Sequence, residues 1–422
     1  MKIQADLLIR NIGELVTMTG SPCLRRGEDA LKLSIIHGGA IAAQNGTVVW
    51  TGTSSDISAS IELEQDAVEI DATGRVVTPG FVDSHTHPLY SGTRQAEYAL
   101  RASGADYEEI ARAGGGILNS VARTRAATSA QIKETLVKHL GTMLQFGTTT
   151  VEVKSGYGLD FDTELRCLQI ASDVAEDWPQ TMLMTFLGAH EVPLEFLDHP
   201  DQYLDYLIKE VLPVVRERKL AHFVDIFCEK GVFTADQSAR YLRAAAEMGF
   251  KLKIHADEFH DTGGAAVAIE TNAVSADHLL SISKSNIERI AASNTVATLL
   301  PGTALFLGKP FPRGRELLDA GACVAIATDF NPGSCFCESM PFMINLAVCQ
   351  CGFTIEEAVT AATINGAAAL GIADRTGALA PGMDADMILW DLDDYRGIAY
   401  HLAVPDIAGV IVNGYLVSTM FD

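Results

Sequence analysis

From Val76 onward, the chain alternates between apolar, β-branched runs and stretches rich in alanine and leucine. Each run ends in polar residues, and a helical stretch such as SAQIKETLVKHLGTMLQFG or TADQSARYLRAAAEMGF follows. This alternation predicts parallel strands joined by crossover helices. Eight units are the number in a TIM barrel, whereas an open doubly wound sheet gives no reason for eight. The runs are 76–87, 148–154, 181–190, 222–229, 251–257, 273–278, 295–301 and 323–329.

The two ends of the chain show a different pattern. Before Gly74 the sequence reads as short strands with turns, ADLLIRNIGELVTM, NGTVVWTG and AVEIDATG, and the last residues are similar, DADMILWDLDD and GVIVNGYLVST. Alternating apolar and polar positions are typical of strands, and both segments lack the helical rhythm. We therefore expect an α/β fold in which a (β/α)8 barrel, residues 76–374, is inserted into a small β-sandwich domain made of residues 1–75 and 375–422.

Polar side chains gather at the carboxyl ends of the eight runs. In a TIM barrel these ends meet at the face that carries the active site, so residues far apart in the sequence are expected to lie together there. The residues at these ends are His85, His87, Glu152, Lys154, His190, Glu229, His255, His278 and Asp329.

His85 and His87 stand two positions apart in FVDSHTHPLY. On a strand such residues share a face, so both imidazoles would aim at one point, whereas two polar loop residues are the alternative. With His255 and Asp329 they form a candidate set of three imidazoles and a carboxylate, which suits zinc or iron with room for a water. A metal lowers the pKa of that water toward about 7. Asp329, in TDFNPG, is also of a type found in turns and helix caps.

Two further residues have the chemistry for proton transfer. Glu258 follows His255 by three positions in HADE, and a carboxyl beside a metal can take up and deliver a proton if its pKa is raised. A surface carboxylate is the alternative. His278, in SADHLL, is a candidate base for the water, a further metal ligand or a hydrogen-bonded core histidine.

The composition narrows the classes of partner. The 422 residues include 54 acidic and 31 basic ones, with a formal net charge of −23. That charge disfavours nucleic acid and anionic membrane, and an anionic substrate would need a local cation. No apolar run is long enough to span a bilayer, and Asp6 and Arg10 interrupt the first residues. Eight scattered cysteines suit reduced thiols, so we expect a cytoplasmic protein without nucleic-acid or membrane partners.

Several segments resemble a known family. FVDSHTHP, KIHADE, SADHL, ATDFNPG and PGMDADMILW are similar to motifs of the metal-dependent hydrolases of the amidohydrolase superfamily. Within it, SGTRQAEY, AGGGILNSVARTRAAT, FGTTTVEVKSGYGL, FLGAHEVP, LLPGTALFLGK and ATDFNPGS resemble the imidazolonepropionases of histidine degradation. The resemblance runs from about residue 77 to the end of the chain. It implies hydrolysis of 4-imidazolone-5-propanoate, an anionic small molecule, to N-formimino-L-glutamate.

The resemblance also implies roles for individual residues. It implies one divalent or ferric metal ion per chain, zinc or iron, held by His85, His87, His255 and Asp329. Glu258 and His278 match the acid/base pair, with Asp329 sharing in proton transfer. The residues that match substrate contacts are Arg94, Tyr107, Tyr157, His190, Glu258, Asn331, Gly333 and Ser334. The family pattern departs at SCFCES, after Ser334. Because such barrels are commonly homodimers, we expect a homodimer.

The residues agree with these implied contacts. A guanidinium can bind a carboxylate with two hydrogen bonds, so Arg94, just past the histidine pair, is a candidate for the propionate. Arg123 and Arg125 are rivals, and a solvated surface arginine is the alternative. Tyr157, in SGYG, is expected on a loop that faces the site. His190 could hydrogen-bond the ring carbonyl or the ring nitrogens.

Three other functions share parts of this pattern. A mononuclear deaminase of the cytosine or guanine type uses the same metal set but releases ammonia. A dinuclear cyclic amidase needs a lysine at the end of the fourth run, which instead reads Phe227-Cys228-Glu229, with Lys230 displaced by one. A non-catalytic metal-binding barrel has no need of an acid/base pair beside the metal.

Overall fold

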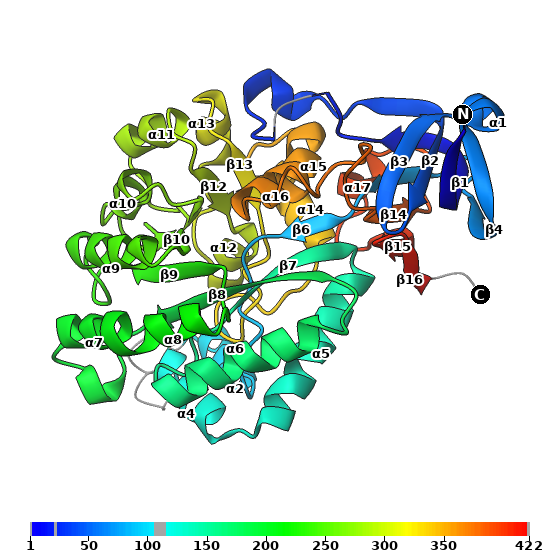
Figure 1. The fold of residues 1–422 in the computed structure, drawn as a ribbon. Helices are drawn as coiled ribbons and strands as arrows, with labels where there is room; N and C mark the ends of the chain where they lie inside the picture. Colours follow the sequence, from blue (N-terminus) through cyan, green and yellow to red (C-terminus); the bar gives the residue numbers. More distant parts are fainter. Residues whose placement is uncertain (1, 21–22, 105–114, 420–422) are drawn as a thin grey trace.

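The computed structural model describes residues 2–20, 23–104 and 115–419, and Figure 1 shows a barrel ringed by helices beside a second sheet. Eight parallel strands form the barrel sheet in chain order, and each predicted run supplies one of them. They are β6 (Phe81–Asp83), β7 (Thr148–Lys154), β8 (Thr181–Ala189), β9 (Phe223–Cys228), β10 (Lys251–Ala256), β11 (Ser275–His278), β12 (Val296–Leu299) and β13 (Val324–Ile326). The predicted (β/α)8 architecture is confirmed.

The barrel closes just beyond its first and last strands. Thr86 and Phe330 form a parallel bridge, and the backbone N–H of His87 donates to the carbonyl of Phe330 at 2.8 Å. The backbone N–H of Asp329 likewise donates to the carbonyl of His85 at 3.0 Å. The segments that follow β6 and β13 therefore lie side by side, although more than two hundred residues separate them.

Helices follow the strands around the barrel, as the alternating pattern predicts. Helices α5 and α9 begin at Thr128 and Thr234, whose side chains accept from the backbone N–H three residues on, so each start is a capping box. The helices are α1 (Ile57–Ser60), α2 (Gln95–Ala102), α4 (Ile117–Ala126), α5 (Ser129–Gln145), α6 (Phe161–Ala175), α7 (Pro200–Tyr206), α8 (Leu212–Glu217), α9 (Ala235–Glu247), α10 (Gly264–Glu270), α11 (Lys284–Ala291), α12 (Pro301–Leu307), α13 (Gly314–Asp319), α14 (Met340–Gln350), α15 (Ile355–Ala362), α16 (Ile364–Ala369) and α17 (Gly397–Tyr400).

The second sheet is made from both ends of the chain, as predicted, and lies at the right of Figure 1. Its strand order is β16-β15-β14-β5-β1-β2-β3, with β4 also paired to β1. Alternate residues of β1 pack into different clusters, Leu7 and Ile9 into one and Leu8 into another. The strands are β1 (Ile3–Val16), β2 (Ile35–Gln44), β3 (Thr47–Thr53), β4 (Ile61–Asp71), β5 (Val76–Pro79), β14 (Met387–Trp390), β15 (Ile407–Val412) and β16 (Tyr415–Thr419).

The run at 76–87, expected as one barrel strand, is divided between the two sheets, so that expectation was wrong. Strand β5 pairs with β14 and β1, and β6 pairs with β7 in the barrel. Gly80 lies between the two strands. A larger residue does not fit there, because a Cβ would clash with the Thr149 side chain. We keep the division into residues 1–75 with 375–422 and residues 76–374 as a proposal. Among the described helices, none is long and apolar enough to cross a membrane.

Candidate active site

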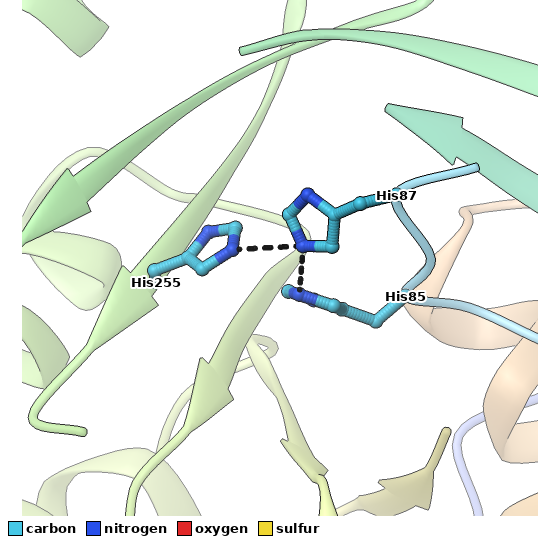
Figure 2. A group of neighbouring side chains, drawn as sticks. All are labelled: His85, His87 and His255. Atoms are coloured by element: carbon cyan, nitrogen blue, oxygen red, sulfur yellow. Dashed lines mark hydrogen bonds between the residues drawn. The ribbon is translucent and has the colours of Figure 1, made fainter. Parts of the chain in front are cut away.

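The carboxyl ends of three barrel strands bring four metal-ligating side chains together. His85 and His87 follow β6, His255 lies in β10 and Asp329 follows β13. Nε2 of His87 lies 3.1 Å from Nε2 of His85 and 3.3 Å from Nε2 of His255 (Figure 2). Oδ1 of Asp329 lies 3.5 and 3.4 Å from Nε2 of His85 and His87. All four side chains are buried. The structure thus unites the four candidate ligands of the sequence.

The hydrogen bonds of these histidines show that the cluster fits a cation. Nδ1 of His85 lies 2.7 Å from Asp277 Oδ2, and Nδ1 of His255 lies 3.1 Å from Asp225 Oδ2. Since a carboxylate only accepts, Nδ1 of His85 carries the proton and its Nε2 keeps a lone pair, and Asp225 faces Nδ1 of His255 at ion-pair distance. Burial and neighbouring positive groups hold the pKa of His85 and His87 well below the usual range, so these rings are neutral. Lone pairs that face one another and a carboxylate fit a divalent or ferric ion.

A layer of buried charges lies beneath this cluster. The Lys154 ammonium lies 2.8 Å from Glu152 Oε1 and 2.7 Å from Asp225 Oδ2. The Lys253 ammonium lies 3.4 Å from Glu152 Oε2 and 3.6 Å from Asp277 Oδ2. Burial by itself lowers the pKa of Lys154, but the adjacent carboxylates raise it above its ordinary value, so the ammonium stays charged. The two lysines therefore hold the carboxylates that orient the histidine ligands.

The same layer contains a second group with metal-ligand spacing, formed by His85, Glu152 and Asp277. Here the positive charge is already present, because the ammonium groups of Lys154 and Lys253 lie against the two carboxylates. The two ammonium groups therefore neutralise the carboxylates of this second group.

Glu258 and His278 lie beside the ligands. His278 Nε2 is 3.7 Å from Glu258 Oε2, and both side chains are buried. Burial, and then the carboxylates of Asp329 and Glu229, raise the pKa of Glu258 well above its usual range. Burial lowers the pKa of His278 to about 3. Burial thus shifts the pKa of the carboxyl upward and that of the imidazole downward, which favours Glu258 as a proton donor and His278 as a proton acceptor.

The backbone at this face is strained at two of these residues. His278 has a φ of 78° and Asp329 a φ of 52°, in the left-handed region that residues with a Cβ rarely adopt. Such strain costs of the order of 1–3 kcal/mol and persists only where the surrounding structure imposes it. The backbone strain therefore supports a functional role for both side chains, which lie beside the histidine cluster.

Tyr157 and His190 border the cluster on the side of β8. The His190 ring stacks on His87 at 5.2 Å between centroids, and the Tyr157 ring lies 5.4 Å from His190. Burial lowers the pKa of His190 to about 3, and its Nδ1 donates to the carbonyl of Gly156 at 3.0 Å. Nε2 of His190 is therefore an acceptor.

Glu164, on α6, holds the SGYG turn that carries Tyr157. Its buried carboxylate accepts from the backbone N–H groups of Gly158 at 2.7 Å, Leu159 at 2.9 Å and Gly156 at 3.1 Å. A carboxylate that accepts several backbone N–H groups fixes the path of a turn. Glu164 thus determines where the Tyr157 ring lies, and the sequence analysis did not identify it.

Arg94 lies at the start of α2 and reaches the segment that follows Asp329. A Cβ on Gly333 would come within 1.9 Å of Arg94 Nη1, so the guanidinium lies directly against that glycine. Its Nε donates to Glu97 Oε2 at 3.0 Å. Of its rivals, Arg125 is paired with Asp160 and Glu195, and Arg123 is exposed on α4. All three arginines have polar partners, Arg94 being paired with Glu97, but Arg94 lies against the segment that follows Asp329, so the geometry favours it among the three.

The substrate loop, which we define as residues 331–338, folds around Asn331. Asn331 Oδ1 accepts from the backbone N–H groups of Gly333 at 2.8 Å and Ser334 at 2.7 Å. Its Nδ2 donates to the carbonyl of Asp329 at 2.7 Å, so the loop is tied to a candidate ligand. Tyr107, expected to contact substrate, lies outside the described residues.

Comparison with known proteins supplies the family. Residues 76–422 match the model of the amidohydrolase family. Three solved structures have the same fold. An adenosine deaminase from Xanthomonas campestris with bound zinc has a TM-score of 0.72 and 17% identity, over 99% of this chain and 93% of that one. E. coli guanine deaminase has a TM-score of 0.69 and 18% identity (98% and 100% covered), and 5-methylcytosine deaminase from Klebsiella pneumoniae has a TM-score of 0.72 and 19% identity (98% and 98% covered). The chain belongs to the amidohydrolase family.

Relatives of higher identity narrow this class. The chain is 46% identical to the imidazolonepropionase of Parabacteroides distasonis, over 98% of this chain and 99% of that protein. It is 45% identical to that of Symbiobacterium thermophilum (98% and 97%) and 43% identical to that of Bacillus cytotoxicus (99% and 98%). Within its family, the chain belongs with the imidazolonepropionases, and it is a hydrolase.

Proposed function

We propose that the chain hydrolyses the cyclic amide of 4-imidazolone-5-propanoate to N-formimino-L-glutamate, a step of histidine degradation. The observation that supports this most directly is the placement of Glu258 and His278, 3.7 Å apart, beside the cluster of candidate metal ligands. Opening a cyclic amide requires a nucleophilic water, a group that accepts its proton and a group that protonates the leaving nitrogen. The full-length identity with imidazolonepropionases agrees with this reaction.

His85, His87, His255 and Asp329 would hold one metal ion, divalent or ferric, as zinc or iron. When bound, such an ion lowers the pKa of a water and polarises a carbonyl oxygen. Asp277 and Asp225 fix the tautomers that turn the lone pairs of His85 and His255 inward.

The remaining steps belong to the side chains. Neutral His278, together with Asp329, orients the attacking water and accepts its proton. Attack on the ring carbonyl gives a tetrahedral centre, and protonated Glu258 delivers its proton to the leaving ring nitrogen, so that the ring opens. Asp329 is the alternative donor. Because Nε2 of His190 is an acceptor, we assign it to a ring N–H of the substrate.

In this proposal, the propionate of the substrate is bound by Arg94. Arg94 offers the nearby guanidinium that an anionic substrate needs in a chain of net charge −23. Tyr157, Tyr107, Asn331, Gly333 and Ser334 line the substrate in this proposal. A homodimer, a cytoplasmic location, and the absence of nucleic-acid and membrane partners remain predictions.

The proposal is tested by a ring-opening assay on 4-imidazolone-5-propanoate combined with elemental analysis of the purified chain. We expect turnover, no ammonia, and one tightly bound metal ion per chain, since Lys154 and Lys253 already neutralise the second candidate group. Stoichiometric release of ammonia from a heterocycle would replace this proposal by a deaminase. Two metal ions per active chain would make His278 a ligand and not a base.

Arg94→Met is expected to raise KM by roughly 10-fold or more and to leave kcat nearly unchanged. The carboxylate of the substrate is the same in the ground state and the transition state, so its loss of binding is largely uniform. Steady-state kinetics checks this, with Arg123→Met on exposed α4 as the matched control. An unchanged KM in Arg94→Met, or a raised one in the control, would move the propionate to another cation.

A further inference from the structure

A buried chain of hydrogen bonds lies outside the metal cluster. The Tyr90 hydroxyl lies 3.1 Å from His139 Nε2, and His139 Nδ1 lies 2.8 Å from Glu338 Oε1. Tyr90 follows the histidine pair, His139 lies on α5 and Glu338 ends the substrate loop. The side chains of Tyr90 and His139 are buried, and that of Glu338 is 15% exposed. Three segments far apart in the sequence therefore meet at one imidazole.

The two hydrogen bonds run in one direction, from the Tyr90 hydroxyl through the His139 ring to the Glu338 carboxylate. The Glu338 carboxylate only accepts, so Nδ1 of His139 carries a proton and donates it. In the neutral ring, Nε2 is then an acceptor, and the Tyr90 hydroxyl donates to it. Each of these groups has a partner, so the removal of either end leaves a buried nitrogen of His139 without its hydrogen bond.

His139 also packs against the substrate loop and the residue that precedes it. Its ring centroid lies 4.5 Å from that of Phe330 and 5.6 Å from that of Phe336. Phe330 stands between Asp329 and Asn331, and its carbonyl closes the barrel through the N–H of His87. His139 is thus the point at which α5 contacts both ends of the segment that contains Asn331, Gly333 and Ser334.

At the other end, the Tyr90 ring contacts Tyr157. Their centroids lie 6.1 Å apart, and Tyr157 in turn borders His87 at 6.3 Å and His190 at 5.4 Å. The hydrogen bonds of Glu338 and His139 are therefore continued by the Tyr90 ring to Tyr157, beside His87 and His190.

We propose that Tyr90, His139 and Glu338 are positioning residues that hold the substrate loop and Tyr157 in a fixed position relative to one another. This deepens the proposed function and rests on it, because the groups so placed are those that would contact the imidazolone. The three residues act on substrate binding through other residues and touch no reacting atom.

The experiment is a double-mutant cycle with two readouts. Tyr90→Phe and Glu338→Ala should each raise KM roughly 3- to 10-fold, the effect of one lost hydrogen bond to a group that stays buried, with kcat within about 2-fold and metal content unchanged. The double variant should raise KM by less than the product of the single effects, because both changes release the same imidazole. Glu338→Gln keeps an acceptor for Nδ1 and should restore most of the binding.

The second readout is hydrogen exchange in the absence of substrate. The backbone amides of Asn331, Gly333 and Ser334 should exchange faster in Tyr90→Phe and in His139→Phe, which keeps a ring between Phe330 and Phe336. The matched control is Tyr395→Phe with Glu356→Ala, a tyrosine–glutamate hydrogen bond of 2.6 Å outside the site, which should change neither readout.

The outcomes separate this proposal from the proposed function. If KM and amide exchange both stay at wild-type values in Tyr90→Phe and His139→Phe, the anchor is wrong. It is also wrong if the variants lose metal or fall in kcat alone. If the wild type does not open the imidazolone, the proposed function fails, but the exchange measurement still decides whether these residues hold the loop.

Discussion

Glu258→Gln and His278→Asn are each expected to lower kcat by roughly 10²-fold or more while the chain keeps close to one metal ion, the usual scale for a positioned proton-transfer group. The two side chains lie 3.7 Å apart, next to the ligand cluster. Burial raises the pKa of Glu258 and lowers that of His278, so Glu258 is suited to donate a proton and His278 to accept one. Glu258→Gln keeps the size and polarity of the side chain, His278→Asn keeps its polarity, and both remove the ability to transfer the proton.

The double variant should cost less than the product of the two single effects, because groups that serve one proton path are not additive. Steady-state kinetics with elemental analysis of each variant checks these statements. Glu134→Gln, on the exposed side of α5, and His37→Asn, whose side chain is 75% exposed, are matched controls. If His278→Asn empties the site, His278 is a ligand. That outcome is a real alternative, because His85, His278 and Asp329 also have metal-ligand spacing.

The repeating pattern of the sequence was enough to predict the barrel and the end of it that carries chemistry. Eight apolar runs imply eight strands, and polar residues at their carboxyl ends must meet when the strands are parallel. His85, His87, His255 and Asp329 were predicted in this way, and the structure brings their side chains together. His85 and His87 were predicted to share one face of a strand, but both follow the end of β6. The bridge between Thr86 and Phe330 holds the segment that carries them.

The residues that hold the ligands could not be found by the same reasoning. Asp277 immediately precedes His278, and Lys253 precedes His255 by two, so both were in view as strand residues. Their partners, however, lie on other strands, and the sequence does not show which buried carboxylate meets which ammonium. Single-sequence patterns identify the end of a strand, but the pairing of charges across the barrel interior is a tertiary property.

The helix patterns of the sequence likewise did not show which residues of α5 and α6 contact the segments around the site. His139 reads as one of several polar residues on α5, and only packing against Phe330 and Phe336 shows that it is buried. Glu164 reads as a first-turn acidic residue of α6, which suits the helix dipole. The fold gives it a second role, because its carboxylate also accepts the N–H groups of the turn that carries Tyr157.

His85→Ala and Asp277→Asn are expected to separate a metal ligand from the group that orients it. His85→Ala removes one of the converging lone pairs, so metal and activity should be lost together. Asp277→Asn keeps His85 but replaces the carboxylate that accepts from its Nδ1 at 2.7 Å, and loss of such a partner lowers metal affinity by roughly 10- to 100-fold.

Added metal distinguishes the two variants, because excess ion compensates for weaker affinity but not for a missing ligand or a missing acid. Zinc or iron in excess should restore Asp277→Asn toward wild-type activity and should not restore His85→Ala or Glu258→Gln. Competition with a chelator measures the affinity, and Asp391→Asn, with a side chain 73% exposed, is the control. Wild-type affinity in Asp277→Asn would show that the carboxylate does not orient His85. If excess metal fails to restore its activity, Asp277 does more than set the metal affinity. Its ion pairs with Lys253 and Lys154 in the buried layer are then the contacts to test next.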